Sequence, residues 1–139
     1  MSQENLEVVR RVIVATQKAF ATDDFAAAFP AGAFAVDFEW VVPTPFEGKS
    51  VWTGVEECIE YLRVWAEQFD DWSYEVLRVI DAGNGRVVVL ARQSAKGKGS
   101  GAPVEAYNGI VYELRDGCIV RAWNYFDHAE ALEAAGLSE

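Results

Sequence analysis

A carboxylate near the end of the sequence follows a run of alternating large side chains. Residues 119–127 read IVRAWNYFD and are rich in strand-forming types. By two-residue alternation, one face of a strand here carries Arg121, Trp123, Tyr125 and Asp127. Two aromatic rings followed by an acid are typical of a pocket wall. A carboxylate beside an apolar wall can acquire a raised pKa, which suits general acid/base chemistry. Asp127 is therefore the candidate catalytic residue.

The same aspartate has a second interpretation as the N-cap of a helix. Asp127 stands directly before a predicted C-terminal helix, and Glu130 follows three residues later, which is the spacing of a capping box. The two roles are compatible, so both stay open. His128 is the only histidine of the chain, which leaves one chain without a Ser-His-Asp triad or a metal site built from several histidines. We expect no metal and no cofactor.

The dipeptide Asp116-Gly117 determines how this strand pairs with the one before it. Asp-Gly between two β-rich runs is typical of a two-residue hairpin turn, because a type I′ turn needs positive φ at both central residues. Such a turn pairs Arg115 with Cys118, and the register beyond follows from that pair. Because cross-strand partners share a face, the preceding strand is expected to contribute Ala106, Asn108, Ile110 and Tyr112 to the wall.

A third strand, expected at residues 36–42 and ended by the prolines that follow, would complete the wall with Phe38 and Trp40. The wall is then mostly aromatic with few polar groups, which is typical of a site for a small apolar or aromatic molecule. Asn108 could orient a ligand carbonyl, since an amide both donates and accepts hydrogen bonds. The opposite face of the hairpin would carry Tyr107, Gly109, Val111, Ala122, Asn124 and Phe126.

The remaining sequence supplies the elements that position this wall. Apolar residues at helical spacing predict helices over 3–20, 25–29, 54–69 and 129–135. Alternation and β-branched residues predict strands over 36–42, 72–81, 85–96, 103–115 and 118–127. This order is typical of an α+β fold in which helices lie on one face of a curved antiparallel sheet. We expect the sheet to wrap around the helices and form a cone with an internal pocket, in a single domain over residues 1–139.

Composition excludes several classes of partner. The chain has 139 residues and a formal net charge of −10, which disfavours nucleic acid and anionic membrane surfaces. No stretch approaches the roughly 20 apolar residues of a membrane span. The N-terminus carries charges where a signal peptide would be apolar, and the two cysteines lack the spacing of a metal site. We expect a cytoplasmic protein with reduced thiols.

The element order and the segment LRDGCIVRAWNYFDHAEALEAAGL (residues 114–137) resemble the SnoaL-like, polyketide cyclase-like family of the nuclear transport factor 2-like superfamily, whose fold is also called cystatin-like. In SnoaL-type cyclases an aspartate at the end of the last strand acts as general acid/base, and Asp127 matches that position. Ketosteroid isomerases carry a base and a tyrosine where this chain has Trp40 and Thr16, so the resemblance does not extend to that chemistry. Nor does the sequence contain the Arg-x-Asp pair of limonene epoxide hydrolases. Relatives commonly dimerise through the outer sheet face, which implies a homodimer.

These features leave more than one function open. The first is a cyclase, isomerase or lyase that uses Asp127 on an apolar carbonyl compound. The second is a non-catalytic ligand-binding or dimerisation domain with the same cone, because this superfamily hosts both kinds of protein. A third is a purely structural dimer whose cone is fully packed.

Overall fold

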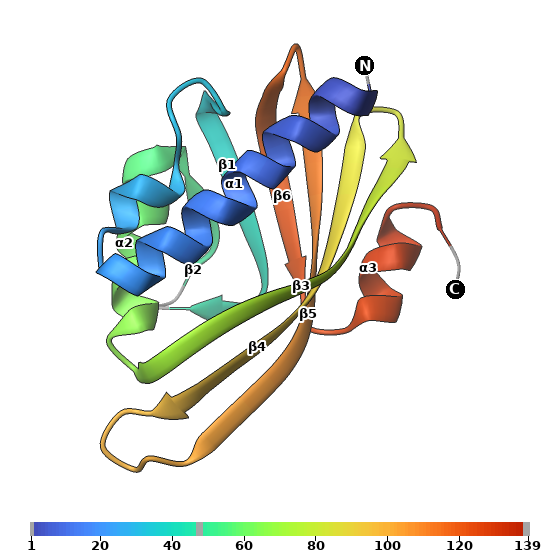
Figure 1. Ribbon diagram of the computed structural model, residues 1–139. Coiled ribbons are helices and arrows are strands. Elements are labelled where there is room, and N and C mark those ends of the chain that lie inside the picture. Colours follow the sequence, from blue (N-terminus) through green and yellow to red (C-terminus); the bar gives the residue numbers. More distant parts are fainter. Residues whose placement is uncertain (1, 47–48, 138–139) are drawn as a thin grey trace.

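The computed structural model describes residues 2–46 and 49–137, and Figure 1 shows a curved sheet with helices packed around it. The helical elements are α1 (Ser2–Thr22), the short 3-10 helix η1 (Phe25–Ala28), α2 (Gly54–Ala66) and α3 (His128–Ala134). The strands are β1 (Phe34–Phe46), β2 (Lys49–Thr53), β3 (Phe69–Gly83), β4 (Arg86–Gly97), β5 (Pro103–Arg115) and β6 (Cys118–Tyr125). Each predicted helix and strand has a counterpart, and β2 is a strand that the sequence pattern did not predict.

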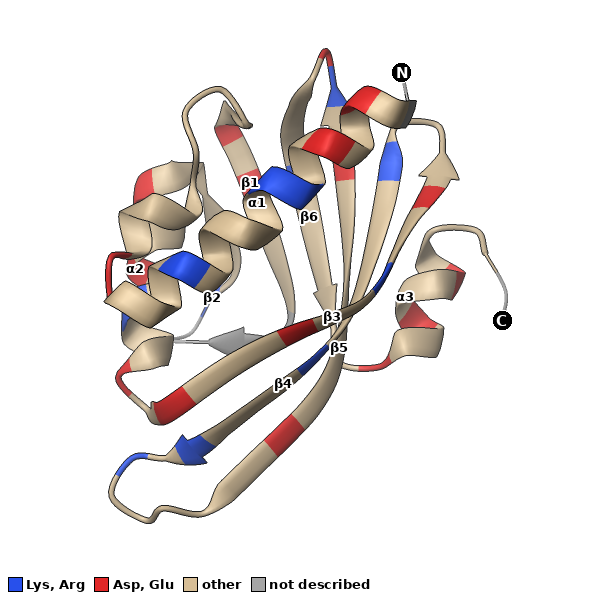
Figure 2. Cartoon of the chain, in the orientation of Figure 1, with Lys and Arg blue, Asp and Glu red and all other residues tan. Residues whose placement is uncertain are grey.

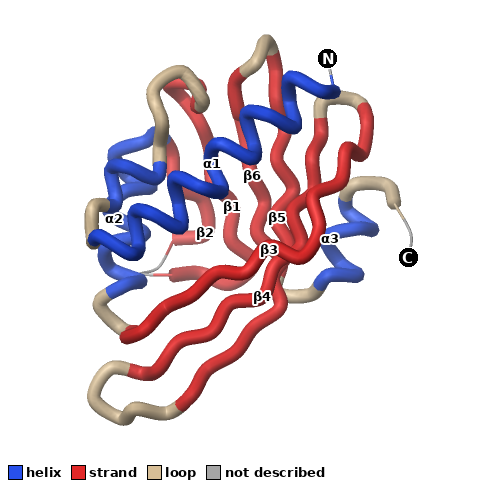
Figure 3. Tube along the Cα trace, viewed as in Figure 1, coloured by secondary structure: helices blue, strands red, loops and turns tan. Residues whose placement is uncertain are grey.

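The strands form one six-stranded sheet in the order β2-β1-β6-β5-β4-β3, seen as a continuous curved layer in Figure 3. Neighbouring strands are antiparallel except β1 and β6, which are parallel. The α+β fold with a curved sheet is confirmed, but the expectation of a wholly antiparallel sheet is wrong at this junction. A hairpin turn forces antiparallel pairing only between consecutive strands, and β1 and β6 are far apart in the sequence.

Two strands are less regular than expected. β1 continues through Pro43 and Pro45 to Phe46, although these prolines were expected to end it. Its pairing with β2 shifts between Val41 and Phe46, and proline is tolerated where a ladder is interrupted in this way. The edge strand β3 is also interrupted, because its pairing with β4 shifts between Asp70 and Ser73, between Val76 and Arg78, and between Asp81 and Gly83. Figure 2 shows several acidic positions along the same strand.

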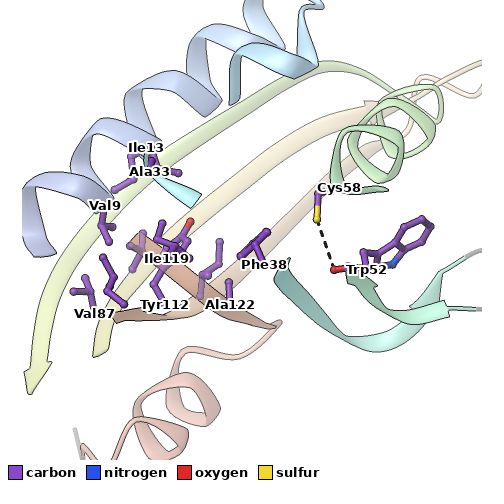
Figure 4. Close-up of a cluster of buried hydrophobic side chains, with 14 of the residues drawn as sticks. Val9, Ile13, Ala33, Phe38, Trp52, Cys58, Val87, Tyr112, Ile119 and Ala122 are labelled. Atoms are coloured by element: carbon purple, nitrogen blue, oxygen red, sulfur yellow. Dashed lines mark hydrogen bonds between the residues drawn. The ribbon is translucent and has the colours of Figure 1, made fainter. Parts of the chain in front are cut away.

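The main core lies between the sheet and the first two α-helices. α1 places Val9, Val12 and Ile13 against inward-facing residues of the sheet, among them Val87 and Tyr112 (Figure 4). Fully burying an aliphatic side chain stabilises a fold by about 1.5–3 kcal/mol, so this stripe holds α1 on the sheet. None of the helices in the described ranges has the length and apolar character to span a membrane.

The third α-helix covers the other face of the sheet, contrary to the expectation that all helices share one face. Ala131 and Leu132 of α3 are buried in a second cluster with Val88, Leu90 and Val111, which point away from the main core. A sheet with an apolar outer face needs such a cover. The chain turns back after β6, and the short α3 buries this part of the outer face.

A β-bulge in β6 sets which of its side chains face inward. The hairpin begins as predicted, with positive φ at Asp116 and Gly117 and with Arg115 paired to Cys118. Leu114 pairs with Ile119, but Glu113 pairs with Arg121, so Val120 is an extra residue. Beyond a bulge, each residue of the bulged strand pairs one place further along than unbroken pairing predicts. Its side chain therefore points to the opposite face from the predicted one. Tyr112 therefore pairs with Ala122 instead of the predicted Arg121.

Candidate ligand-binding site

A cavity of about 310 Å³ lies between the inner face of the sheet and the helices α1 and α2. Its aromatic lining consists of Phe20, Phe29, Phe34, Trp40, Tyr61, Trp65, Phe69, Trp72, Tyr74, Tyr112 and Phe126. The polar lining, tyrosines aside, consists of Thr16, Cys58, Gln93, Ser94, Asn108 and Asn124. Val104 and Phe126 also line the cavity and are 42% and 53% exposed, so it reaches the surface beside them. This volume is at the lower end of the range of small-molecule sites, about 300–1,000 Å³.

One side of the cavity is a packed set of aromatic rings from three elements. Phe20 of α1 stacks on Trp72 of β3 with ring centroids 3.9 Å apart. Trp72 also stacks on Tyr74, at 5.4 Å and an interplanar angle of 10°. Trp65 of α2 meets both Phe20 and Trp72 edge-on at 6.0 Å. Offset stacks and edge-to-face pairs each add about 0.5–1.5 kcal/mol beyond area burial, so these rings form a fixed wall.

The other side carries a polar cluster in which one atom is unpaired. Asn108 is 2% exposed, and its Nδ2 donates a 3.4 Å hydrogen bond to Asn124 Oδ1. Burial raises the pKa of the neighbouring Tyr74, and a hydrogen bond from Asn108 only partly offsets that rise. Asn108 Oδ1 is buried with no hydrogen-bond partner in the described part of the chain. Gln93 differs, because its Oε1 accepts a 2.9 Å hydrogen bond from the Trp72 indole.

The titratable groups of the lining are neutral at neutral pH. Burial raises the pKa of the Cys58 thiol to about 12, and its Sγ donates to the Trp52 carbonyl at 3.7 Å, the contact drawn in Figure 4. Burial also raises the pKa of Tyr61 to about 12, partly offset by the Trp40 indole, and places that of Tyr112 well above its ordinary value. Among the described residues, no Asp, Glu, Lys, Arg or His lines the cavity. The site therefore offers neutral hydrogen-bonding groups on an aromatic surface.

The sequence matches the family of the SnoaL-like domain over residues 13–122, well over half of its length. The chain belongs to the SnoaL-like domain family. The family expected from residues 114–137 is thus confirmed. No curated protein matches the sequence.

Solved structures share the fold of this SnoaL-like domain. An NTF2-like protein from Burkholderia pseudomallei is 22% identical with a TM-score of 0.72, over 94% of this chain and 95% of that one. TerC, co-crystallised with polyporic acid, is 20% identical with a TM-score of 0.70, over 96% and 98% of the two chains. A protein with a ketosteroid isomerase-like fold from Catenulispora acidiphila, in complex with trimethylamine, is 17% identical with a TM-score of 0.68, over 91% and 92%. At these identities the likeness concerns the fold alone.

The structure brings together five of the residues predicted for the wall. The cavity is lined by Trp40, Ala106, Asn108, Ile110 and Tyr112. Their strands alternate as predicted, so the inner faces of β1 and β5 could be read from the sequence. Phe38 lies on the same face of β1 but deeper, fully buried in the core with its ring 6.4 Å from that of Trp40.

The four residues that suggested a pocket wall on β6 lie outside the cavity of this SnoaL-like domain, so their predicted facing is wrong. The bulge at Val120 turns Trp123 and Tyr125 to the outer face, where they pack with α3. Arg121 Nε donates to Glu39 Oε1 at 3.0 Å on the same outer face. Asp127 caps α3, because its Oδ1 accepts hydrogen bonds from the backbone N–H of Ala129 at 2.7 Å and of Glu130 at 3.2 Å.

The residues that replace them in the wall are those assigned to the opposite face. Ala122 points into the main core, while Asn124 and Phe126 line the cavity. The available signal was Asn124 itself, an amide within a strand-forming run, because an amide buried in a sheet normally serves a hydrogen-bond network. The aromatic wall around Trp72 was also missed, since alternation alone does not say which end of a long strand meets the helices.

Proposed function

We propose that this SnoaL-like domain binds a small, uncharged, ring-containing molecule in its cavity, and that the Asp127 carboxylate takes no part in chemistry there. The proposal rests on the lining, in which an aromatic wall faces a cluster of buried amides and phenols. Aromatic rings bind flat apolar ligands by stacking, and a few polar groups fix their orientation. A charged ligand would lose its hydration without gaining an ionic partner, and that penalty is several kcal/mol.

Two considerations support binding over acid/base turnover. The groups that line the cavity are amides, hydroxyls and a thiol with a pKa of about 12, which hydrogen-bond without exchanging protons near neutral pH. Two proteins of similar fold have been solved with a small molecule, polyporic acid in one and trimethylamine in the other. Small-molecule binding is thus within the capacity of the fold, and the present lining favours an uncharged ligand.

Titration calorimetry with 1-naphthol and with 1-naphthoate tests the proposal. We expect 1-naphthol to bind with a Kd in the micromolar range and the carboxylate to bind at least tenfold more weakly. Ala106→Phe should remove binding, because Ala106 lines the cavity and is only half-buried, so the added ring fills the cavity without overpacking the core. Tyr107→Phe, at the adjacent outward position, is the matched control and should bind as the wild type does. Equal affinity for the two ligands, or full binding by Ala106→Phe, would refute the proposal.

We further propose that two copies associate through the part of the outer sheet face that α3 leaves uncovered. This part carries Leu77, and Tyr107 lies at its border, where its ring meets that of His128 of α3; the two side chains are 46% and 47% exposed. Beside them Arg92 forms ion pairs with Glu75 at 3.2 Å and with Glu105 at 3.1 Å. An apolar centre with a charged rim is typical of a protein interface. Sedimentation velocity should give a dimer for the wild type and a monomer for Tyr107→Glu; a monomeric wild type would exclude the interface.

A further inference from the structure

The side-chain carbonyl of Asn108 is a buried acceptor of the cavity lining. Both ends of this amide are buried on β5, but only the nitrogen has a partner, since Nδ2 donates to Asn124 Oδ1 at 3.4 Å. The oxygen has no partner among the described residues. Buried acceptors without a partner are rare in folded proteins, because each loses its hydrogen bonds to water without a replacement. A group retained in this state calls for a partner that comes from outside the chain.

The surroundings of Asn108 indicate what that partner touches. Tyr74 joins the two sides of the cavity, since its ring stacks on Trp72 and the rise that burial causes in its pKa is partly offset by the neighbouring Asn108 amide. A flat ligand that packs along this aromatic wall therefore lies within reach of the amide. Within the Asn108 side chain the atom without a partner is the oxygen, an acceptor, so the ligand group that meets it is a donor. This differs from the expectation that Asn108 would orient a ligand carbonyl.

Building on the proposed function, we infer that Asn108 Oδ1 accepts a hydrogen bond from a donor on the ligand, so that the ligand class is ring compounds bearing a hydroxyl or ring N–H group. Phenols, enols and indole-like heterocycles belong to this class. Ethers and ketones with no donor do not. A site built to pair with a donor rejects an analogue that lacks it, because the buried acceptor then stays unpaired.

A matched pair of ligands separates this inference from the proposed function. We expect calorimetry to give at least tenfold tighter binding for 1-naphthol than for 1-methoxynaphthalene, which keeps the rings and the oxygen but has no donor. Asn108→Leu should bind the two compounds equally, at about the affinity of the wild type for the ether. Tyr107→Phe is the control, because Tyr107 lies next to Asn108 on β5 but does not line the cavity, so this change should leave the preference intact.

The outcomes are distinct. If both compounds bind the wild type equally, or if Asn108→Leu keeps the preference, the donor inference is overturned while binding in the cavity stands. If neither binds, the proposed function fails and the inference fails with it. Should Asn108→Leu not fold, as judged by circular dichroism, the NMR signal of the Asn108 side-chain carbonyl carbon in the wild type decides. The chemical shift of this carbon should change more on addition of 1-naphthol than on addition of 1-methoxynaphthalene, and equal changes count against the inference.

Discussion

Replacing Gly109 by alanine tests how closely α3 sits on the outer face of the sheet. A Cβ at this buried position would lie 2.5 Å from Ala131 Cβ and 3.2 Å from Leu90 Cδ2. Carbon atoms in ordinary contact are about 3.5–4.0 Å apart, so α3 would have to move outward by roughly 1 Å. Overpacking of this kind costs about 1–3 kcal/mol. We expect about 2–3 kcal/mol, because Ala131 has no flexible side-chain end that could turn aside.

Urea unfolding followed by circular dichroism measures this change. In a chain of this length, each kcal/mol lowers Tm by roughly 3–4 °C, so Gly109→Ala should melt about 6–12 °C below the wild type. Ala131→Gly alone should cost about 1 kcal/mol through helix propensity. The double variant should be more stable than the sum of the two changes predicts, by at least about 1 kcal/mol, because the space for the new methyl group is restored. Strictly additive effects, or a loss under about 0.5 kcal/mol for Gly109→Ala, would refute the close contact.

Three further substitutions test other parts of the structure. Asp127→Ala should destabilise the protein by about 1 kcal/mol in urea unfolding through loss of the α3 cap, and should leave 1-naphthol binding unchanged; impaired binding would count against a purely capping role. The Thr53 backbone N–H lowers the pKa of Glu57 in the folded protein. The Glu57 carboxylate therefore stabilises the folded state above its ordinary pKa of 4.5, and this stabilisation is lost as the pH falls through the lower pKa of the folded state. Glu57→Gln should therefore be destabilising at pH 7 and match the wild type in strong acid, and a constant difference across pH would contradict this. In a Cys118→Ser background, Cys58 should resist iodoacetamide at pH 8 until the chain is unfolded, as followed by intact mass, because its pKa is about 12; rapid labelling of folded protein would be the contrary result.

The inner face of β5 could be predicted because two independent signals agree on it. Side-chain alternation places Asn108, Ile110 and Tyr112 together, and the turn at Asp116 and Gly117 confirms where the hairpin begins. Both signals are local in the chain, and they hold here because β5 pairs with β4 without a register shift. The amide that matters most for the proposed ligand was therefore accessible from the sequence.

The facing of β6 could not be predicted, because it depends on one inserted residue. Val120 is an ordinary strand former, and its neighbours Ile119 and Arg121 give no sign of a bulge. The bulge is favoured by the assembled fold, in which Ile119 enters the main core while Trp123 meets α3 on the other face. A helix packed against the outer face makes large aromatic side chains suitable there, and periodicity carries no information about that helix.

The irregular pairing of β3 with β4 helps to prevent aggregation of the protein at high concentration. An edge strand of this length presents free backbone groups that could recruit a strand from another molecule and start cross-β polymerisation. Three shifts in register break the straight edge that such growth requires, and charged side chains along it, such as Asp70, Asp71 and Glu75, would lose hydration beside an incoming strand. Gln17 of α1 also occupies the Tyr74 carbonyl at 2.9 Å. The β3 edge is thereby protected against uncontrolled addition of strands from other molecules, although the sheet does not form a closed barrel.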